Sequence, residues 1–193
     1  LVFRKMVRFG AFVSFPAMLG LAFVAKEFVL ILLGEKWLDS VPFLQLFCLW
    51  GAMGYLSQLY VNLLMTYSRS DVYLSGMILI GLLQILVVWI LYPFGVFNMV
   101  IGYICVYFFS ILFWHYCIKK ELPIKLISIC KDIAPYLVIC ILVFCVVDYT
   151  LRNISDIYIL LIAKILFSLA LYILILLLLK STILKESISY LKR

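Results

Sequence analysis

The sequence predicts an all-α integral membrane protein built as a bundle of six transmembrane helices. Of the 193 residues, 68% are hydrophobic and only 13% are charged, and the mean hydropathy is +1.25. A water-soluble domain needs more polar surface than this composition supplies. The apolar runs are long enough to cross a bilayer as helices, and they lack the alternation of membrane β-strands. Backbone groups in lipid must bond internally, which also favours helices.

Six apolar segments within a single membrane domain, residues 1–193, are each long enough to span a bilayer. The predicted spans cover residues 9–33, 41–67, 72–92, 96–118, 133–151 and 157–179. Pro16 is expected to kink the first span or to mark its inner start. Pro42 and Pro135 are expected in the first turn of their helices, where proline costs least.

Two further segments are predicted to lie at the inner membrane surface. Residues 120–132 place lysines against isoleucines at helical spacing, which is typical of an amphipathic helix on a lipid surface. The tail, residues 180–193, repeats this pattern. We expect both segments to meet membrane lipids, whose anionic headgroups attract clustered lysines and arginines.

The distribution of basic residues predicts the orientation of the chain. Twelve of the sixteen Lys and Arg residues fall on the side of both termini, whereas Lys36 and Arg152 alone lie in connections on the other side. The positive-inside rule therefore places both ends in the cytoplasm. It also accounts for most of the net charge of +7 without nucleic acid as a partner.

No catalytic, cofactor or metal site is predicted. The sequence has one histidine, six cysteines without a C-x-x-C pair, and no glycine-rich phosphate loop or nucleophile–histidine–carboxylate set. His115 and Cys117 stand together at a helix end, but two such residues without further ligands do not make a zinc site. We therefore expect a protein that is not an enzyme.

Polar residues follow one face of the second predicted span. They recur at helical spacing, at Gly51, Tyr55, Gln58, Asn62, Thr66 and Arg69. Small and amide residues hold helices together in lipid, which is a structural interpretation. A continuous polar face also lines a water-filled cavity, which is a functional one. Both interpretations remain open at this stage, and Tyr55, Gln58 and Asn62 are candidate substrate-binding residues.

Charged residues inside the first and sixth spans form a second candidate site. Lys26 and Glu27 lie in the first, and Lys164 lies in the sixth on a face with Ser168 and Tyr172. A lysine in mid-span costs about 3 kcal/mol and needs compensation. Snorkelling toward the surface, or pairing with Glu27 or Asp148, would supply it. The other hypothesis is that both lysines attract an anionic substrate group.

The N-terminal part of the chain resembles a known family. The stretches that carry the resemblance are Pro16–Leu21, Val24–Ala25, Leu33–Trp37, Val41–Leu46 and Asn62–Ser70. They are similar to the C-terminal half of bacterial Wzx-type polysaccharide flippases, within the multidrug/oligosaccharidyl-lipid/polysaccharide exporter superfamily. The specific likeness covers about residues 9–75.

The resemblance implies one half of a pseudo-symmetric transporter in the bacterial inner membrane. Such a protein moves an undecaprenyl-pyrophosphate-linked oligosaccharide across the bilayer by alternating access, for the synthesis of O-antigen, capsule or exopolysaccharide. Its partner half is expected upstream of Leu1, because no internal repeat is visible. A drug/cation antiporter of the same superfamily would instead need an embedded carboxylate, and only Glu27 and Asp148 qualify. A membrane scaffold for polysaccharide assembly is the third possibility.

Overall fold

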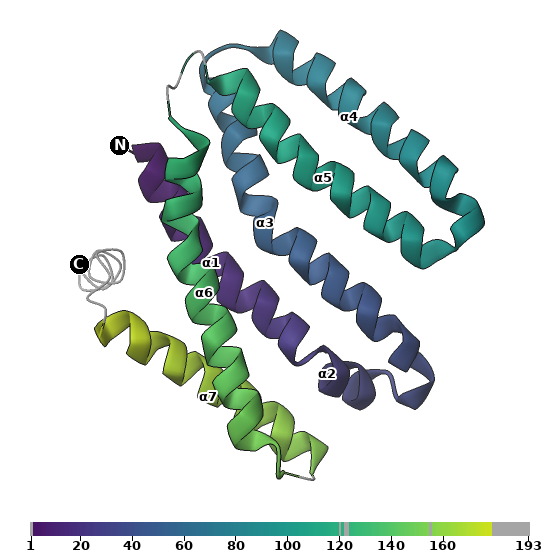
Figure 1. Ribbon diagram of the computed structural model, residues 1–193, viewed down its shortest axis with the longest axis vertical. Helices are drawn as coiled ribbons and strands as arrows, with labels where there is room; N and C mark the ends of the chain where they lie inside the picture. The colour runs from purple at the N-terminus through teal and green to yellow at the C-terminus, as the bar shows by residue number, and fades with distance from the viewer. Residues whose placement is uncertain (1, 120, 122–123, 155, 179–193) are drawn as a thin grey trace.

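The computed structural model describes residues 2–119, 121, 124–154 and 156–178, and in these residues it contains helices and no strand (Figure 1). In chain order the elements are α1 (Val2–Phe23), α2 (Ala25–Leu32), the short 3-10 helix η1 (Glu35–Ser40), α3 (Val41–Thr66), α4 (Ser70–Leu91), the 3-10 turn η2 (Tyr92–Phe94), α5 (Val96–Ile118), α6 (Leu126–Leu151) and α7 (Ile157–Leu178). The prediction of an all-α membrane bundle is confirmed.

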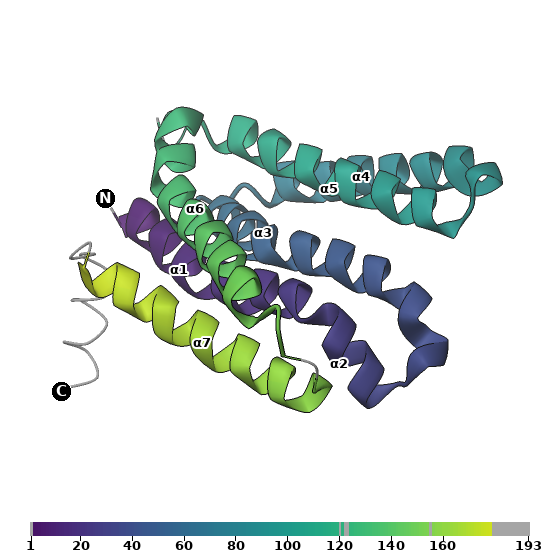
Figure 2. The same cartoon turned by 60° about the horizontal axis from the view of Figure 1, so that its bottom comes forward.

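Helix α1 lies at the centre of the bundle. It packs against α3 on one side and against α6 on the other, while α5 covers α3 and α7 covers α6. Helices α4 and α5 form a hairpin at one edge, and α7 lies at the opposite edge (Figure 2). The close contact between α1 and α3 depends on Gly10, because a Cβ atom there would overlap the ring of Tyr55. Small residues of this kind allow helix backbones to approach in membranes.

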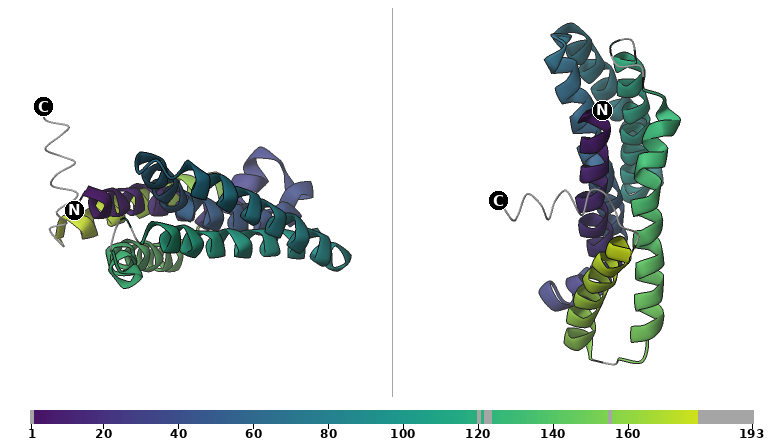
Figure 3. Two further views of the ribbon diagram at one scale, coloured as in Figure 1. Left: turned by 90° about the horizontal axis from the view of Figure 1, so that it is seen from above. Right: turned by 90° about the vertical axis from the view of Figure 1, so that its left-hand side faces the viewer.

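The helix ends fall into two groups along the bundle. The N-terminus of α1 and the C-terminal end of α7 lie at one end, and η1 and the α4–α5 turn lie at the other (Figure 2). The α6–α7 turn also lies away from the N-terminus of α1 (Figure 3). Exposed Trp and Tyr side chains mark these three turns, at Trp37, Trp89, Tyr92, Tyr149 and Tyr158. Such aromatic residues gather where a membrane meets water.

Five helical segments are long and apolar enough to cross a membrane: Val2–Phe23, Ser70–Phe94, Val96–Ile118, Leu126–Leu151 and Ile157–Leu178. Helix α3 has 26 residues, which is ample length. Its polar residues lower its mean hydropathy, so it is not among the five. The structure therefore confirms a membrane helix bundle, while the sixth span stays a prediction.

The first predicted span differs from the structure. Residues 9–33 were expected to form one helix, but α1 already begins at Val2 and the helix is interrupted at Val24. Pro16 lies inside α1 and does not end it. The interruption is mild, because the amide of Val24 still donates to the carbonyl of Gly20 at 3.1 Å.

The inner-surface segment also differs. Residues 120–132 were expected as a separate amphipathic helix, but residues from Leu126 onward form the first turns of α6, which continues to Leu151 through Pro135. Asp132 explains this, because it is buried against α1 and holds the first turns of α6 in the bundle. Pro135 is therefore inside a helix and not in its first turn. Residues 120, 122, 123 and the tail 180–193 lie outside the described residues.

Candidate functional site

A buried cluster of charges joins three helices near the α6–α7 turn. The ammonium Nζ of Lys164 (α7) donates to Oε1 of Glu27 (α2) at 2.8 Å, and it lies 3.4 Å from Oδ1 of Asp148 (α6). It also lies 4.6 Å from the ring centroid of Phe23, at the end of α1. The cluster therefore connects residues from distant parts of the sequence.

Burial within the cluster is uneven. Lys164 and Glu27 are 8% and 7% exposed, whereas the side chain of Asp148 is 66% exposed. Placing one lysine in a membrane span is costly, and a bonded carboxylate offsets much of that cost. Glu27 also lies in the first turn of α2, where the helix dipole favours a negative charge. Its second oxygen, Oε2, is buried and has no hydrogen-bond partner among the residues that the structure describes.

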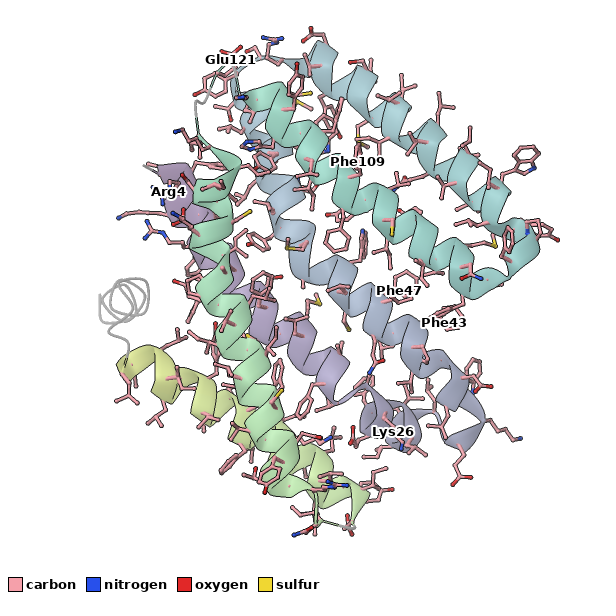
Figure 4. The ribbon with its side chains drawn as sticks, viewed as in Figure 1. Arg4, Lys26, Phe43, Phe47, Phe109 and Glu121 are labelled. Atoms are coloured by element: carbon pink, nitrogen blue, oxygen red, sulfur yellow. The ribbon has the colours of Figure 1, made fainter. Side chains whose placement is uncertain are left out.

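Lys26 does not join this cluster. It is exposed, while its neighbour Glu27 is buried, because adjacent helical residues point in different directions. No ion pair of Lys26 is found within the described part of the chain. Figure 4 shows Lys26 on α2, at the opposite end of the bundle from Arg4 and Glu121. The pairing of Lys164 with Glu27 and Asp148 agrees with the compensation that the sequence analysis considered, and the two predicted lysines are not brought together.

The hydroxyl of Tyr172 bonds to a backbone carbonyl that Pro16 leaves without its helical donor. Proline has no amide hydrogen, so the carbonyl of Phe12, four residues earlier, loses its helical donor. The hydroxyl of Tyr172 (α7) donates to that carbonyl at 3.0 Å. Ser168, one turn earlier, donates to the carbonyl of Lys164 in its own helix at 2.6 Å. The polar face predicted on the sixth span thus has bonding partners inside this part of the bundle.

The polar stripe on α3 divides into a packed half and an exposed half. The ring of Tyr55 packs against Gly10, and its hydroxyl is buried with no hydrogen-bond partner in the described part of the chain. Gln58 and Asn62 are exposed and bond to each other at 3.2 Å, from Nε2 to Oδ1. Thr66 donates to the carbonyl of Asn62 at 2.8 Å. The helix-packing interpretation fits Tyr55, and a hydrated surface at Gln58 and Asn62 stays a prediction.

Two cavities lie beside the charge cluster. The first has a volume of about 850 Å³ and combines charged and aromatic groups, with Phe23, Phe144, Asp148, Tyr149, Arg152 and Lys164 among its lining residues. The second has about 560 Å³, lies between α1, α6 and α7, and is almost wholly apolar. The two share Phe144.

The sequence analysis missed a second ion pair, at the opposite end of the bundle. Arg4 (α1) donates to both oxygens of Asp132 (α6), from Nε at 2.6 Å and from Nη2 at 2.9 Å. Arg8 adds a longer contact of 3.8 Å. Asp132 was treated as part of a surface segment, so its burial was not expected. An acidic residue next to Lys131, at the start of an apolar run, was the available signal.

Tyr60 and His115 form a second polar contact that was not anticipated. The hydroxyl of Tyr60 (α3) lies 3.0 Å from Nδ1 of His115 (α5), inside the core. His115 thus has a structural partner. Within the described residues no three His, Cys, Asp or Glu side chains are grouped so that they could hold a metal ion.

The fold and the buried charges together define a helical integral membrane protein. Its first 42 residues match the model of a family described as "Polysaccharide biosynthesis protein". The chain is also 42% identical over 69 residues to an "uncharacterized membrane protein in cps region" of Klebsiella pneumoniae. It is 37% identical over 70 residues to the lipopolysaccharide biosynthesis protein WzxC of Escherichia coli (strain K12), and 35% identical over 69 residues to the teichuronic acid biosynthesis protein TuaB of Bacillus subtilis (strain 168).

These similarities confirm the resemblance to Wzx-type polysaccharide flippases for a part of the chain. Each aligned stretch covers 36% of this chain and 14% of the relative. The chain therefore matches only a small part of the length of these relatives. No solved structure matches.

Proposed function

We propose that this chain forms part of a transporter that moves an undecaprenyl-pyrophosphate-linked oligosaccharide across the bacterial inner membrane for polysaccharide synthesis. The observation that carries the proposal is the similarity to WzxC and TuaB, whose names refer to lipopolysaccharide and teichuronic acid biosynthesis. The membrane helix bundle is the framework such transport needs. The remainder of the transporter, including a pseudo-symmetric partner half, would complete the pathway.

The exposed amides of α3 support a pathway along this helix. Gln58 and Asn62 both lie in the last third of α3, a helix that packs between α1 and α5. Amides facing lipid would be unfavourable, so we expect this face to border either the rest of the protein or water. Hydroxyl-rich sugars are recognised by such amides through hydrogen bonds. We assign Gln58 and Asn62 to contacts with the glycan.

The test is export of the glycan in cells whose own copy of the gene is deleted and replaced. We expect the full-length protein carrying Gln58→Leu and Asn62→Leu together to insert at normal abundance and to display less surface polysaccharide. Gln84→Leu is the matched control, because it removes an amide from α4, away from the stripe. Normal export by the double variant would show that Gln58 and Asn62 do not contact the glycan.

The orientation follows from the charge asymmetry, with both ends of the chain in the cytoplasm. Single cysteines introduced at Ser40 and at Ser128, in a version otherwise free of cysteine, report it directly. We expect an impermeant maleimide to label position 40 from outside intact cells and to leave position 128 unlabelled. The reverse pattern would invert the topology.

Cation-coupled drug export is the second candidate, and one observation favours it. Glu27 is a buried carboxylate within the membrane region, and its Oε2 bonds to no other described residue. Proton-coupled export of a fluorescent cation by the full-length protein, abolished by Glu27→Gln while glycan export continues, would favour this candidate. A scaffold for polysaccharide assembly would support neither activity.

A further inference from the structure

We propose that the end of the bundle formed by α6, α7 and the close of α1 binds a zwitterionic phospholipid of the phosphatidylethanolamine class. In this site the lipid ammonium lies against Asp148, the phosphate lies against Arg152, and one acyl chain occupies the apolar cavity between α1, α6 and α7. The inference depends on the membrane location of the chain and is independent of the transport reaction.

Asp148 and Arg152 supply a charge of each sign at the mouth of the larger cavity. They are four residues apart at the end of α6 and in its C-cap, so they lie on one face of the helix. Both line the cavity of about 850 Å³. The carboxylate of Asp148 is 66% exposed, with only the long contact to Lys164, and Arg152 is exposed without an ion pair to any described residue. Each therefore has bonding capacity for a ligand.

The apolar cavity continues from this mouth toward the middle of the bundle. On α7 the charged cavity is lined by Leu160 and Lys164, and the apolar cavity by residues 165–173. The latter residues span about 12 Å of helix, which suits a stretch of acyl chain. Phe144 lines both cavities, so the polar and apolar parts adjoin. A charged cavity that adjoins an apolar cavity can bind a molecule with a polar headgroup and an apolar chain.

The balance of charge favours a zwitterion over a pyrophosphate. Glu27 and Asp148 are acidic, and Lys164 and Arg152 are basic, so the four groups sum to no net charge. Lys164 is already bonded to Glu27 at 2.8 Å. A pyrophosphate would bring further negative charge beside Asp148, where like charges repel. An ammonium and a phosphate joined in one headgroup pair with both Asp148 and Arg152.

The height of the site in the membrane agrees with a headgroup. Tyr149 and Tyr158, on either side of the α6–α7 turn, are 82% and 62% exposed. Trp37 and Tyr92 mark the other turns of the same end. Since exposed Tyr and Trp residues gather at the headgroup level, Asp148 and Arg152 lie where a phospholipid headgroup lies, and residues 165–173 lie where its chains begin.

Native mass spectrometry of the full-length protein tests the site. The protein is released from nanodiscs that contain equal amounts of phosphatidylethanolamine, phosphatidylcholine and phosphatidylglycerol, and the lipids that stay bound are counted. We expect preferential retention of phosphatidylethanolamine. The methylated amine of phosphatidylcholine cannot donate a hydrogen bond to Asp148, and phosphatidylglycerol has no amine. The variants are Asp148→Asn and Arg152→Gln, each at an exposed residue.

Asp148→Asn is expected to lower the preference for phosphatidylethanolamine about threefold, equal to roughly 0.7 kcal/mol, which is in the range of an exposed ion pair. Arg152→Gln is expected to lower the retention of all three lipids about threefold and to leave the preference unchanged, because all three carry a phosphate. Glu35→Gln and Lys36→Gln are matched controls, because both residues are exposed at η1, outside the cavity, and their preference should equal that of the wild type. Equal retention of the three lipids, an unchanged preference in Asp148→Asn, or unchanged total retention in Arg152→Gln would overturn the proposal. Displacement of phosphatidylethanolamine by equimolar undecaprenyl phosphate would overturn it too, and would assign the site to the transported lipid.

Discussion

The hydrogen bond between Tyr172 and the carbonyl of Phe12 predicts a stability effect that depends on Pro16. In Tyr172→Phe the carbonyl loses the hydroxyl that bonds it at 3.0 Å, and Pro16 offers no amide in its place. Hydrogen bonds between membrane helices contribute about 0.6 kcal/mol on average and up to about 1.7 kcal/mol. Since the backbone acceptor here has no helical donor, we expect a loss of about 1 kcal/mol in the free energy of unfolding.

A double-mutant cycle isolates this effect. In Pro16→Ala the amide of residue 16 can bond to the carbonyl of Phe12, so the hydroxyl of Tyr172 becomes dispensable and Tyr172→Phe should cost close to nothing. The free energy of unfolding is measured by steric trapping of the full-length protein in bicelles. Tyr158→Phe is the control, because that side chain is exposed. An equal loss from Tyr172→Phe in the wild type and in the Pro16→Ala variant would refute the reasoning.

Three further effects follow from the same structure. Glu27→Gln should lower the free energy of unfolding by about 3 kcal/mol, because Lys164 loses its closest partner, and Glu27→Leu with Lys164→Met should recover most of the loss in the same unfolding assay. Gly10→Ala should cost about 2 kcal/mol, because its methyl group overlaps a ring of α3, whereas Gly81→Ala, which meets nothing within 4 Å, should be neutral. Lys26→Gln should leave the free energy of unfolding unchanged, since the side chain is exposed. It should reduce glycan export if the lysine attracts the pyrophosphate, and unchanged export would show that Lys26 does not contact the substrate.

The helices were predictable because they depend on composition and length. In lipid, a long apolar run with few charges must form a helix to satisfy its backbone hydrogen bonds. Gly34 and Gly95 lie in turns, where the structure has φ angles of 85° and 91°. The start of α1 was not predictable in this way. Arg4 and Lys5 precede the first predicted span, so they were expected to lie outside it. Arg4 is instead within the helix, and its charge is balanced by Asp132, a residue 128 positions away. Pairing at that separation leaves no periodic signal.

The candidate site shows the same division. The position of Lys164 in a span indicated that it needs a partner, and both acidic residues considered for that role lie within 3.4 Å of it. Which face Lys26 takes could not be predicted, because the interruption at Val24 changes the course of the helix between α1 and α2 (Figure 1). Of the two adjacent charges, Glu27 is buried against Lys164 and Lys26 is exposed, and this depends on a neighbour 137 positions away.

This interruption gives α2 a distinct role in the bundle. Helix α2 has only eight residues, too few for stability in isolation, and it contacts α7 and η1 as well as α3. Its contact with α7 includes the bond from Lys164 to Glu27. Breaking this bond would leave an unpaired charge buried in the bundle, which lowers the free energy of unfolding. The ion pair therefore ties α2 to α7, beside the contacts of α2 with α3 and η1. Two of the charges that the sequence indicated as a candidate substrate site, Glu27 and Lys164, therefore have a structural role, because their bond joins α2 to α7.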